Sequence, residues 1–154
     1  MKTKLLILIV LLLFACNNAE KPLTQVEKEK NIAEAKNLIS TIYQAAESND
    51  TAKMTSTFLD SPDFVSLING NFGNYEETVK KYPSYMGEYK SQKATILNEK
   101  YTLLDDSTIL YTSKSKWECK LQNDSIAVYD NCGFLLLLKK TDKDWKVLSW
   151  TETY

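Results

Sequence analysis

The sequence predicts an α+β domain in which N-terminal helices precede a mainly antiparallel sheet. Apolar residues recur at helical spacing between residues 24 and 46, whereas from about Lys93 onward they alternate with polar residues, as in strands. Short turn-rich stretches separate the strand-like segments, and such turns join antiparallel neighbours. With 154 residues, 44% of them hydrophobic and 25% charged, the chain is expected to form a single globular domain.

The first residues have the pattern of an export signal. Lys2 and Lys4 flank the start of an apolar run from Leu5 to Phe14, which is too short for a membrane-spanning helix of ~20 residues. It has the length of a signal-peptide core. The segment Leu13-Phe14-Ala15-Cys16 resembles the lipobox of bacterial lipoproteins. An ordinary cleaved secretory signal and an uncleaved anchor are the alternatives.

The lipobox resemblance implies cleavage before Cys16 and acylation of that residue. The membrane is then a partner of the protein, which is anchored to it through lipidated Cys16. Two or more acyl chains are needed for stable anchoring, and lipoprotein processing supplies them. We therefore divide the chain into a signal peptide (1–15), a lipidated tether (16–23) and one domain (24–154). The expected location is the cell envelope, either periplasmic or associated with the outer membrane.

The first helix is expected to start at Thr24, because Thr24 and Glu27 have the spacing of a capping box. Its apolar stripe consists of Ala35, Leu38, Ile39, Ile42 and Ala46, with Tyr43 at the edge. This stripe predicts one face packed on the rest of the domain.

Two shorter helices and a strand follow. Asp50 is a candidate N-cap for a helix that carries Met54, Phe58 and Leu59 inward. Residues 64–68 predict a short strand, followed by a turn-rich loop. Asn74 can cap a third helix, which Pro83 breaks or kinks and which ends near Gly87.

The last third of the chain predicts long strands. We expect four strands here: residues 95–104, residues 109–121, a strand around residues 134–138 and residues 145–153. The second gives the clearest alternation, with one face formed by Ile109, Tyr111, Ser113, Ser115, Trp117, Cys119 and Leu121. Lysines dominate its other face, so the first face is expected to be buried or to line a cavity.

Cys119 and Cys132 lie on two of these expected strands. An oxidising compartment permits a disulfide between them. Two buried free thiols, packed as small hydrophobic side chains, are the other interpretation. Both alternatives stay open, because the sequence does not provide the Cα separation that a bridge requires.

The element order looks like the nuclear transport factor 2-like, or SnoaL-like, superfamily. The resemblance covers residues 25–154 and rests on Asn49-Asp50, on Phe58-Leu59-Asp60 and on the Asp144–Leu148 segment with its Trp-Lys-Val. It implies a strongly curved sheet that wraps the N-terminal helices into a cone with a pocket at the open end.

We expect seven side chains to line this pocket: Tyr43, Phe64, Tyr111, Ser113, Ser115, Trp117 and Trp150. Small hydroxyls between aromatic rings suit a small amphipathic ligand. Tight packing of the same residues against the long helix is the alternative. Tyr75, Tyr82, Tyr85 and Tyr89 are spaced as one helical face, which predicts a lid, a partner-binding patch or rings packed at the sheet edge.

Composition excludes several kinds of chemistry. The chain has no His and all 19 basic residues are Lys, which rules out a His general base, a Ser-His-Asp triad and an Arg clamp on phosphate. A net charge of −1 argues against a nucleic-acid partner. Enzymes of the superfamily usually place an Asp in or just after the first strand, but residues 65–69 contain no carboxylate.

These observations favour a lipid-anchored module that binds a small, partly apolar molecule without catalysis, cofactor or metal. One alternative is an interaction protein, because members of the superfamily often dimerise through the outer face of the sheet. A second is an isomerase, dehydratase or hydrolase that uses Tyr and Asp. A buried carboxylate in the pocket would favour this last alternative.

Overall fold

The computed structural model describes residues 22–154. The helices are α2 (Gln25–Glu47), α3 (Thr51–Thr55) and α4 (Tyr75–Met86), and the strands are β1 (Val65–Ile68), β2 (Asn71–Gly73), β3 (Tyr89–Leu103), β4 (Thr108–Leu121), β5 (Ile126–Lys140) and β6 (Trp145–Thr153). The signal peptide, Cys16 and most of the tether lie outside the described residues. Within residues 22–154, no helix has the length and apolar character needed to cross a membrane.

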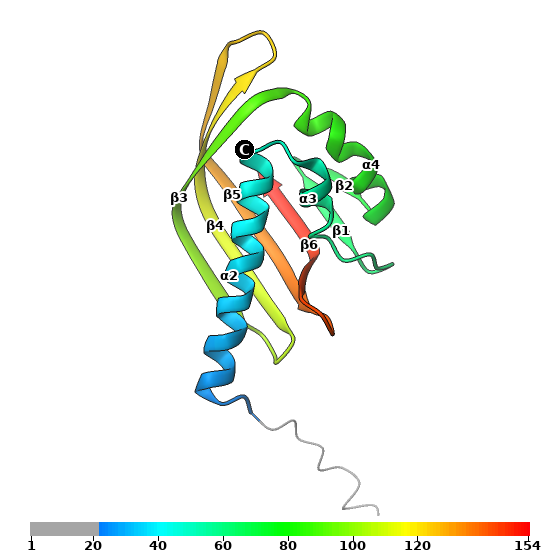
Figure 1. Cartoon of the computed structure of the whole chain (residues 1–154), viewed down its shortest axis with the longest axis vertical. Coiled ribbons are helices and arrows are strands. Elements are labelled where there is room, and N and C mark those ends of the chain that lie inside the picture. Colours follow the sequence, from blue (N-terminus) through cyan, green and yellow to red (C-terminus); the bar gives the residue numbers. More distant parts are fainter. Residues whose placement is uncertain (1–21) are drawn as a thin grey trace, which may run out of the picture.

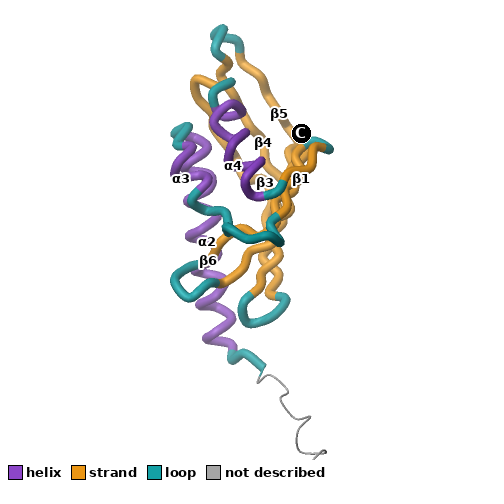
Figure 2. The backbone as a smooth tube through the Cα atoms, turned by 90° about the vertical axis from the view of Figure 1, so that its right-hand side faces the viewer, coloured by secondary structure: helices purple, strands orange, loops and turns teal. Residues whose placement is uncertain are grey.

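The six described strands form one sheet in the order β2-β1-β6-β5-β4-β3. Their pairs are antiparallel except for β1 and β6, which run parallel. The sheet curves, and α2 runs across its concave side (Figure 1). Seen from the side, α2 and α3 lie together on one side of the sheet (Figure 2). This arrangement confirms the α+β prediction with helices on the concave face.

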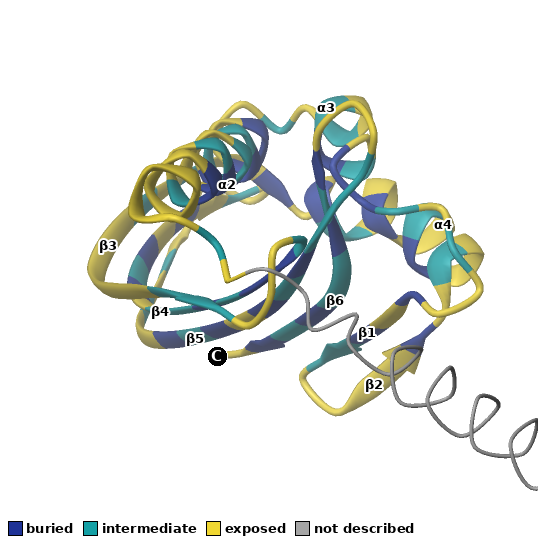
Figure 3. Ribbon diagram, turned by 90° about the horizontal axis from the view of Figure 1, so that it is seen from below, coloured by how far each residue is buried: buried dark blue, intermediate teal, exposed yellow. Residues whose placement is uncertain are grey.

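The N-terminal helix starts where the capping box predicts. The backbone N–H of Glu27 donates to Thr24 Oγ1 at 3.3 Å, and the backbone N–H of Thr24 donates to Glu27 Oε2 at 2.7 Å. Ala35, Ile39 and Ile42 of the predicted stripe are buried. Figure 3 shows the buried part of α2 on the side that faces the sheet. The stripe therefore holds α2 on the sheet.

The two shorter helices are also capped as expected. Asp50 accepts the backbone N–H of Lys53 at 2.9 Å, but α3 ends at Thr55, so Phe58 and Leu59 lie beyond the helix. Phe58 instead forms a β-bridge to Val147 of β6. Pro83 does not end α4, which continues to Met86 and is closed by Gly87. Pro83 has no backbone N–H, so it cannot donate to the carbonyl of Val79 in the preceding turn.

Two differences from the predicted strands matter for the site. Residues 71–73 form β2, which pairs with β1 through a tight turn in which Asn69 and Gly70 have positive φ. A strand of three residues is too short to show a period in the sequence. In addition, β3 starts at Tyr89 rather than near residue 95, so Tyr89 belongs to a strand and not to the helical face of Tyr82 and Tyr85.

A bulge in β6 changes which residues face the helices. Leu137 pairs with Ser149 and Leu138 with Val147, so Leu148 is an extra residue on β6. Before the bulge the odd positions are buried, as at Val147, and after it the even positions are buried, as at Trp150 and Glu152. The bulge therefore turns Trp150 and Glu152 toward the interior.

Candidate functional site

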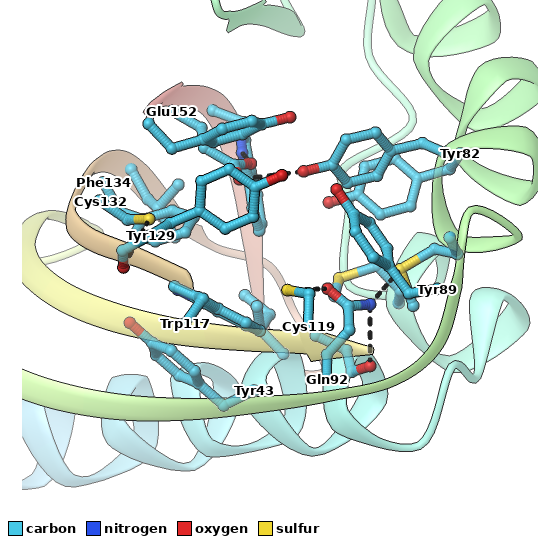
Figure 4. A pocket seen from close by; sticks show the side chains of 18 of the residues that line it. Tyr43, Tyr82, Tyr89, Gln92, Trp117, Cys119, Tyr129, Cys132, Phe134 and Glu152 are labelled. Atoms are coloured by element: carbon cyan, nitrogen blue, oxygen red, sulfur yellow. Dashed lines mark hydrogen bonds between the residues drawn. The ribbon is translucent and has the colours of Figure 1, made fainter. Parts of the chain in front are cut away.

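A small cavity of about 40 Å³ lies between α2, α4 and the concave face of the sheet. Its wall consists mainly of aromatic rings from six elements and the end of the chain: Tyr43, Tyr82, Tyr85, Tyr89, Tyr111, Trp117, Tyr129, Phe134, Trp150 and Tyr154. Glu152 supplies its carboxyl group and Gln92 its amide (Figure 4). We call this space the Glu152 cavity.

Four of the seven side chains expected in the pocket line this cavity, namely Tyr43, Tyr111, Trp117 and Trp150. The ring of Tyr43 stacks on Trp117, with centroids 5.7 Å apart and planes inclined by 17°. Phe134 contacts Tyr43, Trp117 and Trp150 edge-on or tilted. The rings thus form one connected apolar wall.

The other three expected residues lie behind the wall or away from it. Ser115 is fully buried and accepts the indole N–H of Trp117 at 2.9 Å. The hydroxyl of Ser113 lies 3.3 Å from that of Tyr43. Phe64 packs against Phe58 with centroids 5.5 Å apart and against Tyr75 of α4 with centroids 5.8 Å apart. Ser113 and Ser115 therefore position the rings of the wall.

Glu152 is the feature that the sequence analysis missed. Its side chain is only 6% exposed. Trp150 Nε1 donates to Oε2 at 2.9 Å, and the Tyr85 hydroxyl donates to Oε1 at 3.4 Å. Burial raises the pKa of the carboxyl to about 7, although both hydrogen bonds act to lower it. Stepping two residues along the strand from Trp150 would have identified Glu152.

No cation neutralises this carboxyl group among residues 22–154. The ion pairs of the described residues involve other carboxylates, and no described lysine lines the cavity. A carboxylate can accept about four hydrogen bonds, and Glu152 has two donors. The group therefore keeps acceptor capacity inside an apolar space.

Gln92 is the second polar group of the cavity wall. Its Nε2 donates to Asn49 Oδ1 at 3.1 Å and to the carbonyl of Ala46 at 3.3 Å. Its Oε1 accepts the thiol of Cys119 at 3.9 Å. These contacts tie the start of β3 to the end of α2 and hold the amide in one orientation (Figure 4).

Cys119 and Cys132 are both buried free thiols that line the cavity. Cys132 pairs with Ser115, four residues along β4 from Cys119, which corresponds to roughly 13 Å of strand. A disulfide requires Cα atoms within about 7 Å, so this register favours the free-thiol alternative. Burial raises the pKa of both thiols to about 11, which keeps them protonated and weakly nucleophilic.

Four further tyrosines line the cavity, namely Tyr85, Tyr89, Tyr129 and Tyr154. The rings of Tyr129 and Tyr154 meet edge-on, with centroids 5.1 Å apart, and Tyr154 is 42% exposed. Burial raises the pKa of Tyr85 and Tyr89 well above the ordinary range. Both hydroxyls therefore stay neutral, and that of Tyr85 donates a hydrogen bond to Glu152.

Within residues 22–154, no group of three His, Cys, Asp or Glu side chains is arranged to hold a metal ion.

The model of the SnoaL-like domain family matches residues 35–152 of the chain. This match spans the stripe of α2, the strands β1 to β5, and β6 as far as Glu152. No curated protein sequence matches the chain.

Solved structures share the fold at low sequence identity. A candidate scytalone dehydratase from Novosphingobium aromaticivorans DSM 12444 aligns with a TM-score of 0.75 and 10% identity, over 84% of this chain and 87% of that chain. A hexachlorocyclohexane dehydrochlorinase, LinA-type3 from Novosphingobium barchaimii LL02, aligns with a TM-score of 0.72 and 10% identity, over 84% of this chain and 90% of that chain. An NTF-2-like protein of unknown function from Shewanella oneidensis MR-1 aligns with a TM-score of 0.63 and 17% identity, over 80% of this chain and 98% of that chain. The fold is thus that of nuclear transport factor 2.

Proposed function

Because the chain belongs to the SnoaL-like domain family, we propose that it binds a small, largely apolar ligand in the Glu152 cavity. We further propose that lipidated Cys16 holds this domain at a membrane of the cell envelope. The observation that carries the binding proposal is Glu152, a buried carboxyl group without a cationic partner among the described residues.

A purely structural core gains nothing from such a group. Burying an unpaired carboxylate costs free energy, whereas an apolar side chain at the same position would stabilise the fold. Groups of this kind therefore concentrate where a ligand is bound or a reaction takes place. The surrounding wall, apolar apart from a few fixed polar groups, is typical of small-molecule sites.

The free space of about 40 Å³ is well below the ~150 Å³ of an apolar cavity that binds benzene. A ligand of six or more heavy atoms therefore requires side chains to move. Tyr154 is the wall residue whose ring is most exposed, and Tyr129 beside it is half-buried. We infer that ligands enter past these two rings.

Binding can be tested by thermal shift against a library of small apolar molecules that carry one polar group. A ligand at 100 times its Kd stabilises the folded state by about 2.7 kcal/mol. Ala46→Leu should abolish the shift, because Ala46 lines the cavity and the larger side chain occupies it. Ala52→Leu, on the exposed face of α3, is the matched control. Hits that bind the Ala46→Leu variant as tightly would refute a site in this cavity.

Proton transfer at Glu152 is a second candidate function. A carboxyl group with a pKa of about 7 is suited to act as a general base near neutral pH. Glu152 would remove a proton from carbon, the C–H electron pair would form a double bond, and the leaving group would depart with its bonding pair. The dehydratase and dehydrochlorinase names among the structural neighbours support an elimination. Turnover that rises with pH through about 7 and disappears in Glu152→Gln would establish it, whereas bound but unconverted ligands would exclude it.

Lipidation of Cys16 is tested by growing the expressing bacterium with an alkyne-labelled fatty acid. Label should enter the full chain and be lost in Cys16→Ser. A processed protein without label would indicate an ordinary secretory signal. Retention of residues 1–15 by mass spectrometry would indicate an uncleaved anchor.

A dimer through the outer sheet face has one specific observation in its favour. Leu67, Thr151, Leu135 and Thr112 lie in register across four strands on that face, and Leu135 is 43% exposed. Leu135→Lys should convert such a dimer into a monomer by light scattering. A wild-type protein that is monomeric at high concentration would exclude this role.

A further inference from the structure

We propose that the ligand of the Glu152 cavity is a small organic cation, a protonated amine or a quaternary ammonium group attached to an apolar body. This inference rests on the proposed binding function and adds the chemical class of the ligand. It is carried by the charges that surround the cavity, by the aromatic character of the wall and by the unfilled acceptor capacity of Glu152.

The charges exclude an anionic ligand. Glu152 is the one acidic side chain on the described wall, and no described lysine stands near it to attract an anion. An anion would have to approach a buried carboxyl group without a compensating positive charge. A cation, in contrast, supplies the partner that the described residues lack, and it removes the cost of a buried, unpaired carboxylate.

The aromatic wall also favours a cation over an anion. The face of an aromatic ring carries negative charge density and attracts a cation within about 6 Å, most strongly when the site is dry. Tyr43 and Trp117 line the cavity with stacked rings, and the rings of Tyr82 and Trp150 meet beside Glu152. Aromatic rings with one carboxylate are a set of groups that recognises an ammonium ion.

Glu152 can accept further hydrogen bonds from such a ligand. Its two donors, Trp150 Nε1 and the Tyr85 hydroxyl, are neutral and bind one oxygen each. Each carboxylate oxygen has room for a second donor. An N–H of an ammonium group would form a charge-assisted hydrogen bond, which is about twice as strong as one from a neutral hydroxyl.

The pH dependence of binding follows from the groups that face Glu152. These are Tyr82 and Tyr85 of α4, Cys119 of β4, Cys132 of β5 and Tyr154 at the end of β6. Their pKa values are all raised, so they stay neutral up to pH 8. Glu152 alone in this set titrates near 7, and its ionised fraction rises about tenfold between pH 6 and pH 8.

The experiment measures three probes of similar size on the full chain by isothermal titration and tryptophan fluorescence. The probes are benzylamine, benzyl alcohol and benzoate, which present a cation, a neutral hydroxyl and an anion on one ring. We expect benzylamine to bind at least tenfold more tightly than benzyl alcohol at pH 8, and benzoate not to bind. The affinity for benzylamine should rise about tenfold from pH 6 to pH 8.

Glu152→Gln should lower the affinity for benzylamine at least tenfold and abolish the pH dependence of that affinity. The affinity for benzyl alcohol should stay within a factor of three of the wild-type value. Glu88→Gln, in the exposed connection between α4 and β3, is the matched control and should change neither. Equal or tighter binding of benzyl alcohol at pH 8, or benzylamine binding that Glu152→Gln does not weaken, overturns the cation proposal while a binding site remains. If none of the probes binds the wild type, the cation proposal fails, and the binding proposal fails with it only when the thermal-shift library also gives no ligand.

Discussion

Replacing Glu152 by Gln should make the protein more stable at alkaline pH. The ordinary pKa of a glutamate carboxyl is 4.5, and burial raises that of Glu152 to about 7. At ~1.4 kcal/mol for each pH unit between these two values, ionising the buried group costs about 3 kcal/mol. Gln has the same shape and carries no charge, so it avoids this cost while it keeps an oxygen that can accept from Trp150.

The direction with pH follows from proton linkage. Between pH 4.5 and 7 the unfolded chain releases the proton of Glu152 whereas the native protein retains it. The free energy of unfolding of the wild type therefore falls as the pH rises through this window, and it levels off above the native pKa. Other shifted groups contribute little here, because the pKa values of Glu34, Asp105 and Asp124 are lowered and those of Cys119 and Cys132 lie at about 11.

Urea unfolding at half-unit steps from pH 5 to pH 8.5 measures this effect, with equal m-values as the check on two-state behaviour. The wild type and the control Glu88→Gln should lose up to about 3 kcal/mol across the range. Glu152→Gln should lose much less and should exceed the wild type at pH 8. A Glu152→Gln profile parallel to that of the wild type would refute the assignment of a raised pKa to this carboxyl group.

Four further predictions concern other parts of the fold. Trp150→Phe removes the indole donor at 2.9 Å from Glu152. In urea unfolding, the stability that this variant loses relative to the wild type should be about 1–2 kcal/mol larger at pH 8 than at pH 5. An equal loss at both pH values would contradict this prediction. Gly73→Ala should cost about 1–3 kcal/mol, because the new Cβ would lie 2.9 Å from both Ser66 Oγ and Thr78 Oγ1, whereas Gly133→Ala meets only the exposed Thr153 hydroxyl at 3.1 Å and should be tolerated. Asn74→Ala should lower stability by about 1 kcal/mol through loss of the α4 cap, and Asn74→Asp should retain it. Iodoacetamide should label Cys119 and Cys132 slowly in the native protein and fully in urea without reductant, as read by peptide mass spectrometry; labelling that requires reductant would indicate a disulfide.

The helices were the most predictable part of the molecule. The starts of α2, α3 and α4 depend on side chains at Thr24, Asp50 and Asn74 that accept a backbone N–H three residues away. The buried face of α2 follows from local spacing in the same way. Such signals are contained within a few adjacent residues and can therefore be recognised without the tertiary structure.

The long strands were predictable up to their irregularities. The alternation of β4 placed Tyr111, Trp117 and Cys119 on the inner face, where the structure has them. The extra residue at Leu148 in β6 reverses the alternation, and the sequence carries no local sign of this bulge. Pairing with β5 decides its position, and it determines that Glu152 faces the cavity instead of solvent.

The sequence by itself determined the order of elements, the helix caps, the apolar faces and the absence of His and Arg from any site. Only the tertiary structure decided the register that places Cys132 opposite Ser115 rather than Cys119, and that Glu152 meets Trp150 and Tyr85 in an aromatic cavity. The reason is physical. Caps and periodicity are set by neighbours along the chain, whereas burial, and the pKa that follows from it, depend on residues that folding brings together from α2, α4 and four strands.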